Sequence, residues 1–119
     1  ATAPGAVPRC LTPQFAATPD GAALARKLHD TLVSTDAQGY IAACEGVAAI
    51  DFRESNKKID RPTLVIAGAR DEATPVAMSE QMVAAIPGAR LASIEAAHLS
   101  AVERPADFVQ LLKSFYASL

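Results

Sequence analysis

The sequence predicts an α/β fold, in which a helical segment precedes a strand-helix-strand-helix unit of a parallel sheet. Three observations support this fold class. The chain has 119 residues, 50% of them hydrophobic, which suits one globular domain. Its second half contains a short apolar run over residues 62–68 and a second predicted strand over residues 90–94, with a helical pattern between them. A further helical pattern follows the second strand, and this alternation is typical of parallel sheets.

Residues 1–50 are expected to be mainly helical after an irregular start. Turn-forming residues are frequent in residues 1–21 and predict turns there rather than helix. Asp20 is a candidate N-cap for the first helix, in which leucines recur at positions 24, 28 and 32. A second helix is predicted to begin at Thr35 or Asp36. Its apolar face would contain Tyr40, Cys44, Val47 and Ala48.

The polar residues 51–61 are expected to connect this helical segment to the sheet. The run "TLVIAG" follows and ends at Gly68; it is rich in β-branched residues and predicts a strand buried on both faces. Thr74 is a candidate cap for the next helix, because Pro75 would then occupy its first turn, where proline is tolerated. The inner face of that helix would contain Met78, Met82 and Ile86.

The second strand is predicted over residues 90–94, after a turn at Pro87 and Gly88. The last helix is predicted to begin at Pro105 and to bury a row of apolar side chains at helical spacing, which are Phe108, Leu111, Leu112 and Phe115.

Composition and charge argue against several classes of function. A net charge of -2, without a basic stripe, argues against a nucleic-acid partner. The apolar runs are far shorter than the roughly 20 residues of a membrane helix, so no membrane partner is expected. The first ten residues lack the features of a signal peptide, and we therefore expect a cytoplasmic location. Cys10 and Cys44 match no zinc or redox motif and are expected to be buried free thiols.

Asp71 and His98 are the candidate catalytic residues. Each follows directly after a predicted strand, and functional groups in parallel sheets gather beyond the carboxyl ends of the strands. An aspartate that accepts the Nδ1 proton of a histidine fixes the tautomer of the ring and stabilises the imidazolium that forms during nucleophilic catalysis. Taken singly, Asp71 could equally stabilise a turn, and His98 could be an ordinary loop histidine.

The order of this pair matches the last two members of an α/β-hydrolase triad. "PTLVIAGARDEATP" and "IPGARLASIEAAHLSAVERPADF" resemble the C-terminal part of α/β-hydrolases, most closely 3-oxoadipate enol-lactonases. "RCLTPQF" and "GYIAACEGVAAIDFRE" resemble the helical cap of that group and its connection to the core. The resemblance divides the chain into part of a cap (1–50), a connection (51–61) and the C-terminal part of the hydrolase core (62–119). Many relatives have glycine where this chain has Ala97.

The resemblance implies a serine hydrolase that cleaves a small lactone or ester, most closely 3-oxoadipate enol-lactone in aromatic catabolism, without a metal or organic cofactor. None of the seven serines lies in a G-x-S-x-G motif, so we expect a C-terminal portion of a longer hydrolase that is inactive alone. An open sheet edge would then favour self-association or binding of the missing N-terminal half. Two alternatives are another small-ester hydrolase, such as an esterase or a haloperoxidase-like enzyme, and a non-catalytic association module.

Other charged residues have weaker assignments. Glu72 and Glu103 are expected to be solvated acids or acids near the start of a helix. A substrate carboxylate would need a cationic or polar anchor, and the sequence leaves the choice open between Arg9, Arg26, Lys27 and Arg70.

Overall fold

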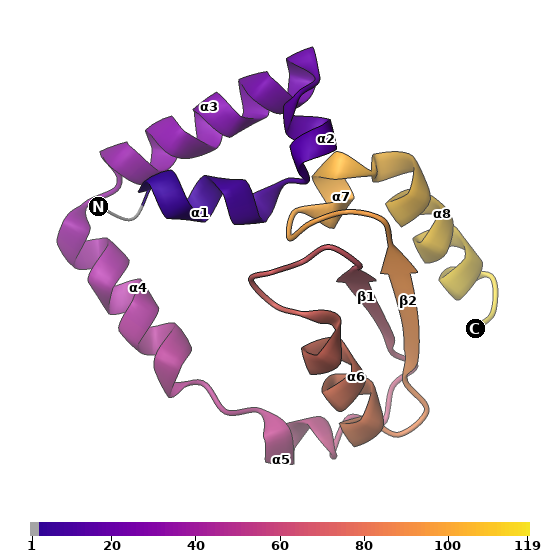
Figure 1. Ribbon diagram of the computed structural model, residues 1–119. Coiled ribbons are helices and arrows are strands. Elements are labelled where there is room, and N and C mark those ends of the chain that lie inside the picture. The colour runs from indigo at the N-terminus through magenta and orange to yellow at the C-terminus, as the bar shows by residue number, and fades with distance from the viewer. Residues whose placement is uncertain (1–2) are drawn as a thin grey trace.

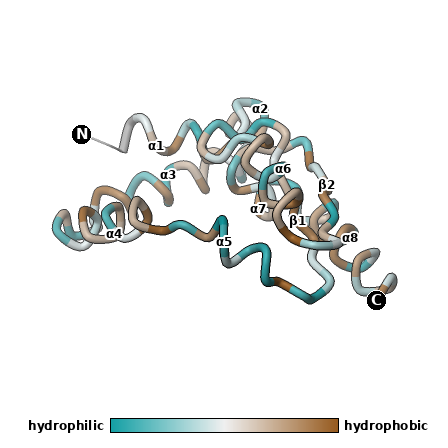
Figure 2. The backbone as a smooth tube through the Cα atoms, turned by 90° about the horizontal axis from the view of Figure 1, so that it is seen from below, coloured by the Kyte–Doolittle hydropathy of each residue, from teal (hydrophilic) through white to brown (hydrophobic). Residues whose placement is uncertain are grey.

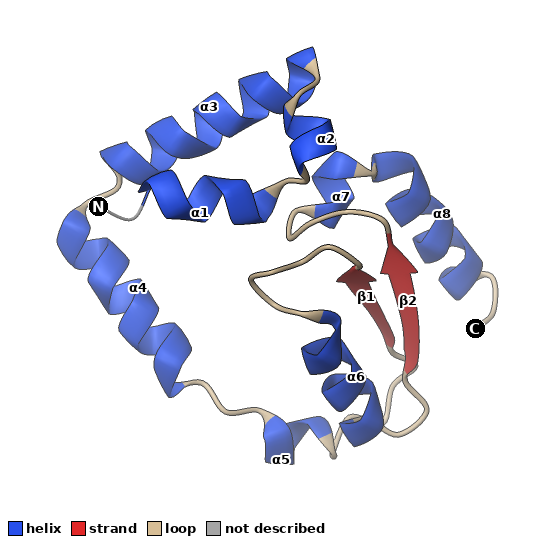
Figure 3. Ribbon diagram, viewed as in Figure 1, coloured by secondary structure: helices blue, strands red, loops and turns tan. Residues whose placement is uncertain are grey.

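The computed structural model describes the backbone of residues 3–119 and the side chains of residues 5–119. Residues 1 and 2 of the predicted cap segment therefore lie outside the described part. The elements, in chain order, are α1 (Ala3–Cys10), α2 (Pro13–Ala16), α3 (Pro19–Ser34), α4 (Ala37–Ala49), α5 (Arg53–Asn56), β1 (Leu64–Gly68), α6 (Val76–Ala85), β2 (Arg90–Ile94), α7 (Ser100–Glu103) and α8 (Pro105–Tyr116) (Figures 1 and 3).

The predicted strand-helix-strand-helix unit is confirmed. β1 and β2 pair in parallel, from Leu64 opposite Arg90 to Gly68 opposite Ile94. The helices α6 and α8 flank this small sheet on opposite sides in the view of Figure 1. The buried apolar residues of this unit lie near the carboxyl ends of the strands and at the end of α6, and they are Ala67, Ile86, Ile94, Ala96 and Ala97. The loops that follow the two strands therefore start from the best-packed part of the sheet.

The irregular start that the sequence predicts is wrong, because residues 3–10 form helix α1 in spite of Pro8. This helix packs against α3, and such tertiary contacts can outweigh the low helix propensity of proline. The predicted cap of α3 is also wrong. Thr18 caps the helix by accepting a hydrogen bond from the N–H of Gly21 at 3.0 Å, and Pro19 takes the first helical position. Asp20 lies in the first turn, where a carboxylate is favoured by the helix dipole.

The predicted start of α4 is confirmed, since Asp36 caps it by accepting a hydrogen bond from the N–H of Gly39 at 2.7 Å. Its predicted apolar face remains uncovered within the described residues: every residue of α4 is exposed except Tyr40, which is half-buried. Figure 2 shows α4 set apart from the group formed by the strands, α6, α7 and α8. Cys44 is exposed and Cys10 is half-buried, so the expectation of buried thiols is wrong.

The helix after β1 differs from its prediction in two ways. It begins at Val76, and Pro75 holds the N-cap position without a side-chain bond, so Thr74 does not cap it. Of the three apolar residues expected on its inner face, Ile86 is buried, whereas Met78 and Met82 are exposed because a two-stranded sheet covers only part of the helix.

The last two helices and the strand faces complete the fold. The start of α8 at Pro105 is as predicted, although its four apolar side chains are half-buried rather than buried. The strand β1 is likewise only partly buried in its first three residues. Within the described residues, no helix has the length and hydropathy that crossing a bilayer requires.

Candidate active site

The two residues that follow the strands are in direct contact. Nδ1 of His98 lies 2.9 Å from Oδ2 of Asp71, although 27 positions separate the residues in sequence. The Asp71 side chain is only 7% exposed and the His98 side chain is 40% exposed, so the acid lies beneath a ring that reaches the surface. The structure therefore brings together the pair that the sequence singled out.

The carboxylate of Asp71 is also held by its own loop. Oδ1 accepts hydrogen bonds from the backbone N–H groups of Ala73 and Thr74, both at 2.8 Å. Oδ2 accepts a hydrogen bond from the hydroxyl of Thr74 at 2.7 Å, and that hydroxyl oxygen lies 3.3 Å from Nδ1 of His98. Aspartate often stabilises a turn by accepting hydrogen bonds from the backbone two and three residues later. This turn preference of Asp71 is the sequence signal that could have identified Thr74 as its partner. The turn role and the histidine contact occur together, so the two sequence interpretations of Asp71 do not exclude each other.

These hydrogen bonds lower the pKa of Asp71. Burial by itself would raise the pKa of Asp71, but the hydrogen bonds from the Thr74 N–H, from His98, from the Thr74 hydroxyl and from the Ala73 N–H outweigh it and lower the pKa from 3.8 to about 2. The group is ionised at neutral pH and can only accept hydrogen bonds. The proton between Asp71 and His98 therefore belongs to Nδ1, and Nε2 of a neutral His98 is left as a proton acceptor.

Backbone bonds between the two loops fix the separation of the pair. The N–H of Ala69 donates to the carbonyl of Ile94 at 2.8 Å, and the N–H of Arg70 donates to that of Ala96 at 3.0 Å. Gly68 permits this approach: a Cβ on it would lie 2.4 Å from the carbonyl oxygen of Ala97, well inside van der Waals contact. The pair thus depends on backbone contacts that a larger residue at position 68 would disturb.

Glu103 matches its prediction only in part. It lies in the first turn of the short helix α7, as an acid near a helix start would, but it is buried, at 7% exposed, rather than solvated. One oxygen, Oε2, accepts hydrogen bonds from the N–H groups of Thr12 and Ala97, at 3.1 Å and 3.2 Å. The other accepts a hydrogen bond from the Thr12 hydroxyl. A single sequence gives no sign of such a contact, because Thr12 is 91 positions away.

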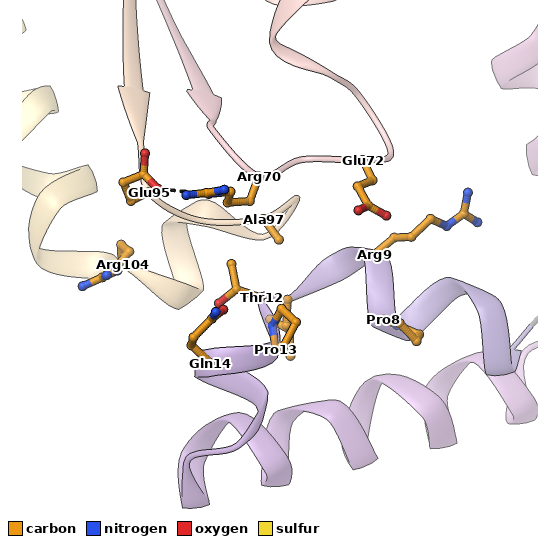
Figure 4. A pocket seen from close by; sticks show the side chains of 11 residues that line it. Pro8, Arg9, Thr12, Pro13, Gln14, Arg70, Glu72, Glu95, Ala97 and Arg104 are labelled. Atoms are coloured by element: carbon orange, nitrogen blue, oxygen red, sulfur yellow. Dashed lines mark hydrogen bonds and ion pairs between the residues drawn. The ribbon is translucent and has the colours of Figure 1, made fainter.

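A cavity of about 580 Å³ lies between the α1–α2 turn and the two loops, and its lining includes Ala97, the residue before His98. Figure 4 shows Arg70 directed toward Glu95 and Arg9 on the opposite side of the cavity. The Arg70 Nε donates to Glu95 at 3.2 Å. Glu72 also lines this cavity and is exposed, as expected.

The other two cationic candidates lie elsewhere. Arg26 and Lys27 line a separate surface hollow on α3. The structure therefore leaves Arg9 and Arg70 as the sequence-predicted cations next to the His98 loop, with Arg104 as a third arginine that the sequence did not single out.

Comparisons with known proteins identify relatives of the chain as a whole. No protein-family model matches the chain. It is 40% identical over 96 residues to 3-oxoadipate enol-lactonase 1 of Acinetobacter baylyi, an alignment that covers 81% of this chain and 36% of that protein. It is 36% identical over 81 residues to pyrrolizixenacetamide deacetylase of Xenorhabdus hominickii, covering 68% of this chain and 30% of that protein.

Solved structures similar to this chain identify its fold. The enol-lactonase from Burkholderia xenovorans superimposes with a TM-score of 0.87 and 31% identity, over 97% of this chain and 44% of that one. The chain therefore spans less than half the length of these relatives. Because nearly the whole chain follows a hydrolase backbone at this identity, it belongs to the α/β-hydrolases and has part of their fold, a helical segment followed by a parallel strand-helix-strand-helix unit.

Proposed function

We propose that the protein containing this chain hydrolyses a small lactone or carboxylic ester, with Asp71 and His98 as two members of its catalytic triad. The observation that carries the proposal is the hydrogen bond of 2.9 Å between Nδ1 of His98 and an ionised, buried carboxylate. It directs the basic Nε2 away from Asp71 on a ring that is partly exposed, as a general base requires.

The reaction follows from this geometry. A serine hydroxyl attacks the carbonyl carbon of the substrate while Nε2 of His98 takes the hydroxyl proton. The negative charge of Asp71 stabilises the imidazolium that forms, and His98 then gives the proton to the departing oxygen. Water attacks the acyl-enzyme in the same way and releases the acid. Asp71 stays ionised throughout, which its lowered pKa supports.

The serine of this proposal lies outside residues 1–119, in the part of the hydrolase fold that the chain does not cover. None of the serines in the sequence stands in a G-x-S-x-G motif. A covering segment would also bury apolar side chains that the described residues leave exposed, among them Val47, Ile50 and Phe52. On this proposal, the 119 residues alone are inactive.

An enol-lactone with a carboxylate is the proposed substrate, since the relative with 40% identity is named 3-oxoadipate enol-lactonase. The cavity beside Ala97 offers cationic groups for such a carboxylate. Arg9 is the better candidate, because Arg70 already pairs with Glu95.

The test uses the naturally expressed protein and its His98→Ala variant. Turnover of the enol-lactone is expected to fall at least about 10⁴-fold in the variant, because the general base is lost. A serine-directed phosphonate should label the wild-type protein at a serine outside residues 1–119. Turnover that survives the loss of His98, or labelling of one of the seven serines within the sequence, would contradict the proposal.

A second candidate is hydrolysis of a different small acyl substrate, which the similarity to a deacetylase favours. The two candidates are separated by comparing kcat/KM for 3-oxoadipate enol-lactone with that for p-nitrophenyl acetate. A preference of at least about 100-fold for the enol-lactone, the order of discrimination that a binding pocket gives, is expected for the first.

A further inference from the structure

Glu103 joins two segments that are far apart in sequence. Its buried carboxylate receives two hydrogen bonds from Thr12, in the turn between α1 and α2, and one from the N–H of Ala97. Figure 4 shows Thr12 next to Ala97, and both residues line the cavity. Hydrogen bonds to a charged acceptor are among the stronger ones in proteins, and a buried donor that loses its acceptor is costly.

A second bond acts on the other side of His98. The N–H of Leu99 donates to the carbonyl of Cys10 at 3.0 Å. The residues before and after His98 are therefore both tied to the short segment 10–12, one through Glu103 and one directly. The backbone of His98 lies between two fixed points.

This support matters because the His98 ring is partly exposed. Its side chain is 40% exposed, and its recorded polar contacts within the described residues are with Asp71 and Thr74, both through Nδ1. The direction of Nε2 thus depends on the position of the backbone as much as on the bond to Asp71. A displacement of about 1 Å in such a group can lower a rate about 100-fold.

We propose that Glu103 is a positioning residue for His98, which acts through the backbone of Ala97 and makes the α1–α2 turn part of the support of the catalytic pair. The effect on turnover rests on the proposed function, whereas the effect on the ring does not. On this proposal, the helical segment holds the histidine loop in place.

The shape of the contact defines informative variants. In Glu103→Gln, the amide oxygen can still accept from the N–H groups of Thr12 and Ala97, while the amide NH₂ donates to the Thr12 hydroxyl oxygen. In Glu103→Leu, all of these bonds are lost. The glutamine variant therefore keeps the geometry without the charge.

Turnover of the naturally expressed protein is the first measurement. We expect kcat of Glu103→Leu to fall on the order of 10- to 100-fold, with KM changed less than about threefold, and Glu103→Gln to recover most of the loss. Ile86→Ala is the control for lost stability, because Ile86 is buried at the end of α6, away from His98, and its kcat should stay near that of the wild type. An unchanged kcat in Glu103→Leu, or an equal loss in Ile86→Ala, would overturn the proposal.

A milder pair of variants covers the case in which Glu103→Leu does not fold. Thr12→Val and Thr18→Val each remove a hydroxyl that caps a helix, but only Thr12 bonds Glu103. A fall in kcat in the first and not in the second supports the proposal. Equal effects of the two changes would refute it.

The side-chain ¹⁵N resonances of His98 provide a readout that needs no substrate. In the wild type, Nδ1 should carry the proton, and Glu103→Leu or Thr12→Val should shift the average toward a mixture of tautomers, whereas Thr18→Val should not. A wild-type tautomer pattern in both Glu103→Leu and Thr12→Val would overturn the positioning role. If the His98→Ala variant keeps full turnover, the proposed function fails, and the tautomer measurement still decides the role of Glu103.

Discussion

The Asp71→Asn substitution tests the site most directly. Asp71 accepts two backbone N–H groups at Oδ1, so the amide oxygen of an asparagine must occupy that position. Its NH₂ group then takes the place of Oδ2 and faces Nδ1 of His98, which lies 2.9 Å from Oδ2 in the wild type. A donor in this position forces Nδ1 to accept and moves the ring proton to Nε2.

The expected loss of activity follows from this change of tautomer. A neutral ring with its proton on Nε2 cannot take a proton from a nucleophile at that atom. The same substitution in a serine-protease triad lowers kcat about 10⁴-fold. We expect a loss of that order, which corresponds to about 5 kcal/mol of transition-state stabilisation.

The assay combines turnover of the enol-lactone at pH 7 with the ¹⁵N shifts of the His98 ring. Asp36→Asn is the matched control, since Asp36 also accepts a backbone N–H but caps α4 and makes no recorded contact with His98. It should leave both readouts unchanged. A folded Asp71→Asn protein that retains turnover within about tenfold of wild type, or that keeps the proton on Nδ1, would refute the reasoning.

Two further predictions concern stability. The folded-state pKa of Asp71 is lowered from 3.8 to about 2, so ionised Asp71 stabilises the folded protein above about pH 4, and this stabilisation is lost as the pH falls toward 2. The shift is equivalent to at most roughly 2.5 kcal/mol of unfolding free energy. Solvent screening at the partly exposed His98 reduces this to about 1–2 kcal/mol. Between pH 5 and pH 2.5, the unfolding free energy measured in urea should fall more for the wild type than for Asp71→Asn. An equal fall in the two proteins would contradict this prediction. Gly68→Ala should destabilise the protein by about 1–3 kcal/mol or more and reduce turnover, because the new Cβ would lie 2.4 Å from the carbonyl of Ala97. Gly46→Ala, which meets no atom within 4 Å on α4, should instead be neutral or stabilising by up to about 1 kcal/mol in thermal unfolding, and similar melting temperatures for the two variants would argue against the close approach.

The elements that the sequence predicted correctly are those with strong local signals. The strand β1 is a short apolar run that ends at a glycine, β2 follows a proline-glycine turn, and α8 begins at a proline that is followed by helical periodicity. The capping contact of Asp36 is also local, since it reaches only three residues along the chain. In each case the residues that determine the structure are neighbours in sequence.

The errors have the opposite origin. Residues 3–10 are helical because they pack on α3, and Met78 is exposed because the sheet beneath α6 has two strands within the described residues. In both cases the structure depends on contacts with residues that are distant in sequence. The sequence predicts Thr74 as the cap of the following helix, whereas its hydroxyl bonds the preceding Asp71.

For the site itself, the sequence determined which residues are present and in what order: an acid after one strand and a histidine after the next. That was enough to predict their meeting, because the carboxyl ends of neighbouring parallel strands lie at one edge of a sheet. Only the tertiary structure decided how the pair is held. The burial of Glu103 between Thr12 and Ala97 depends on segments 91 and 6 positions away coming together around one carboxylate, and a hydrogen bond of this kind has no counterpart in the local sequence pattern.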